Sequence, residues 1–119
     1  MLIKVANREQ LESIVSDEQN KDKIILANFG ATWCGPCKMM LPNYEKLSEK
    51  YSQFLFTKLD IDEVDDLAEM YNISTIPSII FLDYGSLVSK YRAHVGSDIN
   101  ALENRLKSMS ITTTVSVDF

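Results

Sequence analysis

The two cysteines of this chain, Cys34 and Cys37, are the residues whose type and spacing most directly indicate chemistry. Gly35 and Pro36 separate them, and an apolar run typical of a buried strand precedes them. Cysteines at this spacing in the first turn of a helix can close a small disulfide ring and keep their sulfurs close when it is reduced. The pair therefore predicts reversible redox chemistry.

The predicted helix start gives the two thiols different roles. Unpaired backbone N–H groups and a partial positive charge favour a thiolate there, so we expect Cys34 to be the solvent-open nucleophile. Cys37 lies one turn further in, where we expect it to be shielded and to resolve a mixed disulfide. Gly35 allows a partner backbone to come near, and Pro36 is tolerated because its missing N–H had no intrahelical acceptor.

Other uses of the cysteines are less favoured. A C-x-x-C pair is also half of a zinc site, but the chain adds no third cysteine and only His94, so we predict no metal. A ring of four residues constrains the unfolded chain too little for a purely structural bridge. The acidic run 60–66 lacks the spacing and glycine of a calcium loop and is interpreted as a solvated helix start. His94 could bias partner choice with pH, although a lone histidine is more often without chemistry.

Composition limits the class of protein further. The 119 residues, with 45% hydrophobic and 24% charged, are typical of one globular domain. The formal charge of −5 argues against a nucleic acid partner. The longest apolar stretches have four residues, far below the roughly 20 needed to cross a bilayer, so we predict no membrane span.

Alternating extended and helical patterns predict an α/β fold with a mixed central sheet of about five strands and about four helices. The strands are predicted at 2–5, 23–29, 54–60, 78–82 and 87–95, the last two as a hairpin. The helices are predicted after an Asn7 cap, at 34–51 and 64–71, and from Ser97 or Asp98 to 109.

We predict a domain at 1–109 and a flexible tail at 110–119, with an added edge strand or a docking segment as alternatives for the tail. The first residues lack a secretory leader, which favours the cytoplasm. A chain that had already lost a leader would look the same, so an organelle or secretion stays open.

The segment Trp33-Cys34-Gly35-Pro36-Cys37-Lys38 resembles the active-site motif of the thioredoxin family. The resemblance extends over about residues 2–107 and includes Pro42, 58–62, 75–77, Gly85 and 95–96. It implies a thioredoxin-like fold and a thiol–disulfide oxidoreductase that reduces disulfides in client proteins. It also implies that a thioredoxin reductase or an equivalent recycles the chain, and that the chain holds no cofactor.

The same resemblance implies site residues. Cys34 matches the attacking cysteine, Cys37 the resolving one, and Pro77 the family's cis-proline facing the disulfide. The positions implied to support the active site are Trp33, Gly35, Pro36, Asn28, Lys58 and Pro77. Those implied to bind an extended client segment are Trp33, Ile76, Pro77, Val95 and Gly96. Without the resemblance, Pro77 would be interpreted as a proline at the start of a strand, and the other four would more often be ordinary core by composition alone.

One position departs from the family pattern. Asn28 stands where the family usually has a buried aspartate, whereas the neighbouring lysine is kept as Lys58. An amide has no titrating proton in the relevant range, so our hypothesis is that Cys37 is activated less well and mixed disulfides live longer. Alternatively, Asn28 merely forms hydrogen bonds in the core.

A second functional class is an adaptor or assembly subunit of a larger complex, with the same fold but slow redox turnover. Asn28 and the extra residues after Ser108 tilt slightly towards it. An oxidase or isomerase is disfavoured, because Gly-Pro between the cysteines accompanies the reducing members of the family.

Overall fold

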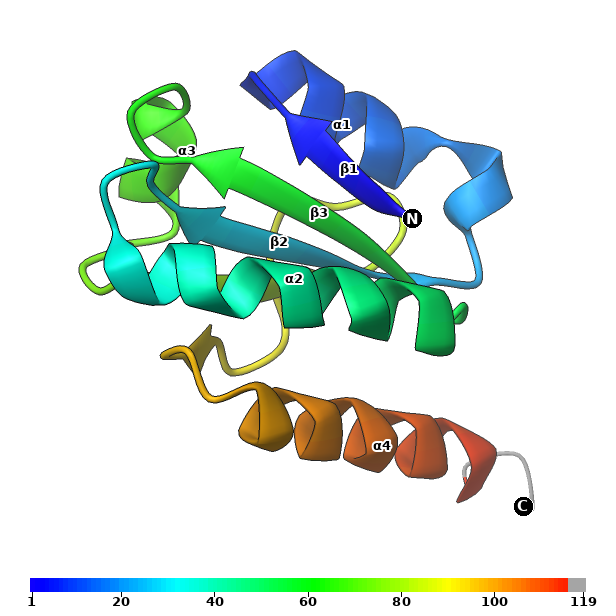
Figure 1. Cartoon of the computed structure of the whole chain (residues 1–119). Coiled ribbons are helices and arrows are strands. Elements are labelled where there is room, and N and C mark those ends of the chain that lie inside the picture. Colours follow the sequence, from blue (N-terminus) through cyan, green and yellow to red (C-terminus); the bar gives the residue numbers. More distant parts are fainter. Residues whose placement is uncertain (116–119) are drawn as a thin grey trace.

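The computed structural model describes residues 1–115, and the side chains of residues 1–110. Its strands are β1 (Leu2–Val5), β2 (Ile24–Gly30), β3 (Phe54–Asp60), β4 (Ser78–Leu82) and β5 (His94–Val95). Its helices are α1 (Arg8–Ser16), α2 (Gly35–Lys50), α3 (Asp65–Met70) and α4 (Ile99–Val115), with a short 3₁₀ helix η1 (Glu18–Asn20) (Figure 1). The predicted order of strands and helices is confirmed, and η1 is added to it.

The strands form one mixed sheet in the order β1-β3-β2-β4-β5. The strands β1, β3 and β2 are parallel, whereas β4 runs antiparallel to β2 and β5 antiparallel to β4. Five strands and four α-helices within the described residues confirm the predicted fold class. The strand β2 lies at the centre, so the segment that follows it begins in the most constrained part of the sheet.

The helices cover the sheet from both sides. One apolar cluster joins α1 and α3 to the sheet, and the other joins α2 and α4 to its opposite face (Figure 1). Helix α2 contributes Met40, Tyr44 and Leu47, and α4 contributes Leu102 and Leu106. Burying these side chains fixes α2, and therefore its first turn, against the sheet.

A buried hydroxyl also fastens α2. The Tyr44 hydroxyl donates a hydrogen bond of 2.9 Å to the Thr57 carbonyl of β3. Burial raises the pKa of Tyr44 well above its ordinary value. A neutral phenol that satisfies a backbone acceptor in the core orients the helix as well as holding it.

The segment after β4 differs from the prediction. A strand over 87–95 is wrong for most of its length, because only His94–Val95 pairs with β4. Side chains take the place of the ladder there: the Ser89 hydroxyl donates to the Phe81 carbonyl, and the Tyr91 hydroxyl donates to Asp83. Serine side chains that bond to backbone groups compete with strand pairing.

Two helix ends refine the prediction. Asp98 caps α4, because its carboxylate accepts the N–H groups of Asn100 and Ala101. Helix α4 runs to Val115, beyond its predicted end at residue 109, so the predicted boundary between domain and tail falls inside a helix. The rest of the predicted tail, 116–119, lies outside the described residues.

Replacing Leu102 by alanine tests the packing of α4. Leu102 is fully buried in the cluster shared with α2, so we expect the free energy of unfolding to fall by about 2–5 kcal/mol. Denaturant unfolding measures the change. The exposed Asn104→Ala on the same helix serves as the control and should change stability by less than about 0.5 kcal/mol. Equal curves for the two variants would contradict this packing.

Candidate active site

The end of β2 leads directly into the cysteine motif. After Gly30 the chain makes a short turn in which the Cys34 N–H donates to the Ala31 carbonyl at 3.2 Å. Cys34 is the N-cap of α2, and its carbonyl accepts the Lys38 N–H at 3.1 Å. The predicted position of the first cysteine at the start of a helix is confirmed.

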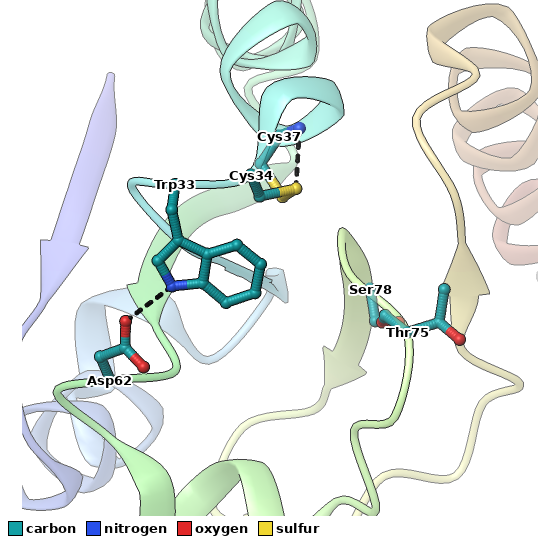
Figure 2. The surroundings of a disulfide bond; sticks show 6 residues. All are labelled: Trp33, Cys34, Cys37, Asp62, Thr75 and Ser78. Atoms are coloured by element: carbon teal, nitrogen blue, oxygen red, sulfur yellow. Dashed lines mark hydrogen bonds between the residues drawn. A yellow bond between two sulfur atoms is a disulfide. The ribbon is translucent and has the colours of Figure 1, made fainter.

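Cys34 and Cys37 form a disulfide, with their Cα atoms 5.3 Å apart. The Cys37 N–H points at the Cys34 sulfur, at a distance of 3.3 Å from nitrogen to Sγ (Figure 2). A backbone donor aimed at this sulfur favours its charged form once the disulfide is reduced. The geometry therefore favours a thiolate at Cys34.

The exposure of the two cysteines differs from the prediction. Cys34 is only 7% exposed and Cys37 is half-buried, so the expectation of an open Cys34 and a shielded Cys37 is wrong for the disulfide form. The N-cap position turns the Cys34 sulfur back over the first turn of α2, where it is bonded to Cys37. Cys37, by contrast, faces a cavity.

A cavity of about 260 Å³ lies behind the disulfide. It is lined by residues from β1, β2, β3 and the start of α2: Lys4, Asn28, Gly30, Ala31, Thr32, Cys37, Lys38, Leu41, Lys58, Leu59 and Asp60. It thus brings Asn28 and Lys58, which the family resemblance implied to support the active site, into the same cavity lining as Cys37.

Gly30 is a site residue that the sequence did not predict. A Cβ at this position would lie 3.2 Å from the Cys37 Sγ, closer than ordinary van der Waals contact. The missing side chain therefore makes room for the sulfur. The sequence feature that could have indicated this role is a glycine directly between a buried apolar run and the cysteine motif.

Asn28 is 6% exposed, and its Oδ1 has no hydrogen-bond partner among the described residues. The alternative that Asn28 merely forms hydrogen bonds in the core therefore leaves this oxygen unexplained. Asn28 and Lys58 are direct partners in the pairing of β2 with β3, so both side chains belong to one row of the sheet.

Trp33 is 65% exposed, yet it is held in place. Its indole N–H donates to the Asp62 carboxylate at 2.9 Å, as Figure 2 shows. The Asp62 N–H in turn donates to Asp60 Oδ1 at 2.9 Å. Asp62 orients the ring beside the disulfide, although nothing in its residue type or spacing distinguishes it from the other acidic residues around it.

The other residues that the resemblance implied to bind a client lie near the place where β4 and β5 pair. The Ile76–Pro77 peptide bond is cis, as the resemblance implied. The Gly96 N–H donates to the Pro77 carbonyl at 2.9 Å, and Val95 pairs with Ser78 at the start of β4. Ile76 is half-buried and Val95 is 58% exposed. The apolar side chain of Val95 is therefore accessible to solvent on β5.

His94 lies on β5, paired with Ile79, and does not line the cavity behind the disulfide. Its Nε2 is buried without a hydrogen-bond partner among residues 1–110. Burial, followed by the nearby Arg105, lowers the pKa of His94. The ring is therefore neutral near pH 7.

Two other kinds of site are not found in the described part of the chain. Its side chains include no group of three or more His, Cys, Asp or Glu that could hold a metal ion. None of its helices is both long enough and apolar enough to cross a bilayer.

The sequence is similar to known thioredoxins. A sequence model of the thioredoxin family matches residues 2–108. Thioredoxin-2 of Saccharomyces cerevisiae is 42% identical over 87 residues, which are 73% of this chain and 81% of that protein. Thioredoxin H4-1 of Oryza sativa is 33% identical over 106 residues, which are 89% of this chain and 79% of that protein.

Solved structures agree with the sequence matches. A Schistosoma mansoni thioredoxin superposes with a TM-score of 0.78 at 39% identity, covering 90% of this chain and 94% of that one. A poplar thioredoxin h gives a TM-score of 0.83 at 31% identity, covering 91% and 95%. Similarity of this extent, in sequence and in structure, shows that the chain belongs to the thioredoxin family and is a thiol–disulfide oxidoreductase.

Proposed function

We propose that the chain reduces client disulfides with Cys34 as the nucleophile and Cys37 as the resolving thiol. The observation that carries these roles is the Cys37 N–H donating to the Cys34 sulfur at the start of α2. It favours a thiolate at Cys34, and the thiolate is the attacking species in disulfide exchange.

The reaction proceeds in two exchanges. The Cys34 thiolate attacks one client sulfur, forms a mixed disulfide and releases the other client sulfur as a thiolate, which takes up a proton. Cys37 then loses its proton and attacks the Cys34 sulfur, so that the bond to the client breaks and the second client thiolate leaves. The client gains two electrons, and the chain ends as the Cys34–Cys37 disulfide seen here.

Trp33, Ile76, Pro77, Val95 and Gly96 are proposed to bind the client. Two observations support this role: Trp33 is exposed but oriented by Asp62, and Val95 projects from the short strand β5 next to Pro77. An extended client segment placed between them would lie over the disulfide.

Thioredoxins act on disulfide-containing substrates and are reduced by a thioredoxin reductase, and this chain shares their fold and cysteine pair. The cytoplasm as compartment and membership of a larger complex remain predictions. The adaptor alternative is not favoured, because the relatives named above are thioredoxins.

Replacing each cysteine by serine separates the two roles. Reduction of insulin by dithiothreitol should fall to the uncatalysed rate for Cys34→Ser and for Cys37→Ser, because both exchanges are needed for turnover. Only Cys37→Ser should accumulate a covalent client adduct on a non-reducing gel. An adduct on Cys34→Ser instead would reverse the assignment, and turnover by either variant would contradict the proposed function.

Gly30→Ala tests the contact behind Cys37. The added Cβ would press on the Cys37 sulfur, which the disulfide holds in place but the reduced form leaves free to move. Overpacking costs about 1–3 kcal/mol, so we expect the reduction potential to rise by roughly 20–60 mV, measured against glutathione. Gly35→Ala, whose Cβ would meet nothing within 4 Å, is the control and should show a smaller shift. Equal shifts would mean that Gly30 has no special role.

A further inference from the structure

The strand β5 is held to the sheet by few backbone groups. It has two residues, His94 and Val95, and residues 83–93 before it form no strand. After it, the Gly96 N–H donates to the Pro77 carbonyl at 2.9 Å. Val95 and Gly96, which we call the client edge, are among the residues proposed to bind the client. A segment with so few ladder contacts opens easily, so the side chains that fasten it decide where the client edge lies.

The His94 side chain lies on the face of the sheet that α4 covers. Register partners on neighbouring strands present their side chains to the same face. The partner of His94 is Ile79, which packs in the apolar cluster shared with α2 and α4. Val95, the next residue, points to the opposite face. The His94 ring is therefore placed between the client edge and α4.

The charged groups that act on this ring are mostly cationic. They are Arg92 in the segment before β5, Asp98 at the start of α4, and Arg105 one side of α4 further along. The strand β4 adds none, because Ser78–Leu82 contains no charged residue. Arg105 is half-buried and fixed in place, since it donates to the Arg92 carbonyl at 2.7 Å and lies 4.8 Å from the centre of the Phe81 ring.

The ring nitrogen Nε2 of His94 is buried and has no hydrogen-bond partner among residues 1–110. A neutral imidazole can leave one nitrogen lone pair unpaired, whereas the protonated ring is a donor at both nitrogens and carries a charge. Burying such a donor and its charge without an acceptor is costly. A protonated ring therefore has to turn towards solvent, and the two-residue strand that carries it has little to keep it in place.

We propose that His94 is a positioning residue for the client edge: its neutral ring holds Val95 and Gly96 against β4, and its protonation releases them. This inference rests on the proposed function and deepens it, because it makes client binding depend on pH. Burial, followed by Arg105, lowers the pKa of His94 from 6.5, and the charge of Asp98 opposes this less strongly. The released ring takes up its proton more readily, so the attached edge is favoured above pH 6.5 and loses stability as the pH falls below it.

Hydrogen exchange of the Gly96 amide tests the release, in the oxidised chain, where neither cysteine titrates. The opening constant is the measured exchange rate divided by the intrinsic rate at the same pH. It should rise by up to about tenfold from about pH 7.5 to about pH 5.5, the most that a group of ordinary pKa 6.5 can contribute there. In His94→Phe, which keeps an aromatic ring but takes up no proton, it should change by less than about twofold. A constant that does not depend on pH in the parent would overturn the proposal.

Two controls separate release of the edge from other effects. Asp98→Asn can still cap α4 but removes the carboxylate that favours a protonated ring, so its rise should equal or exceed that of the parent. The amide of Ala27, on the central strand, should have a lower opening constant than Gly96 at every pH. Equal constants would mean that the whole domain unfolds, which would overturn a local release. If His94→Phe does not fold, as judged by circular dichroism, the neutral His94→Gln takes its place.

The consequence for the client is measured in a Cys37→Ser background, which traps the mixed disulfide. The rate with a neutral peptide disulfide is divided by the rate with hydroxyethyl disulfide, which is too small to need the client edge, so that the ionisation of Cys34 cancels. This ratio should fall by up to about tenfold between about pH 7.5 and about pH 5.5, and it should stay constant when His94→Phe is added. A constant ratio without His94→Phe would overturn the link to client binding. The proposed function fails on a different result, insulin turnover by the cysteine variants, so the two failures are distinguishable.

Discussion

The hydrogen bond from the Cys37 N–H to the Cys34 sulfur is the interaction on which the site depends. It exists because Cys34 occupies the N-cap of α2, and that position is fixed by what surrounds the helix. The central strand β2 delivers the chain to this point, and Tyr44 ties α2 to the sheet through a buried hydroxyl. Much of the fold therefore serves to hold one helix start in place.

The elements with strong local patterns could be predicted from the sequence. The bounds of β1, β3 and β4 agree with their apolar runs, and Asn7 caps α1 through the Gln10 N–H. The segment before β5 could not be predicted in this way, because hydroxyl groups of Ser89 and Tyr91 replace the backbone ladder. Those contacts depend on the position of β4 in the fold, which cannot be predicted from the alternation of apolar and polar residues in this segment.

The part of the site that is formed by neighbouring residues in the sequence could be predicted. The roles of Cys34 and Cys37 follow from their spacing, whereas the cis bond at Pro77 and the residues proposed to bind the client came from the family resemblance. Other features of the site could not be predicted, because they depend on strand register and on contacts between distant segments. They are the close approach of Gly30 to Cys37, the hydrogen bond from Trp33 to Asp62, and the pairing that places Lys58 beside Lys4 and Asn28. The low exposure of Cys34 also depends on how its side chain turns at the helix start, which residue type does not determine.

Both outer strands of the sheet are short: β1 has four residues and β5 has two. A long free edge offers unpaired backbone groups on which another chain can add a strand, and repeated addition leads to aggregation. An oxidoreductase of proteins meets extended polypeptide segments whenever it works, so it is repeatedly exposed to this hazard. Edges too brief to template a growing sheet allow the chain to hold a client for one exchange and then let it go.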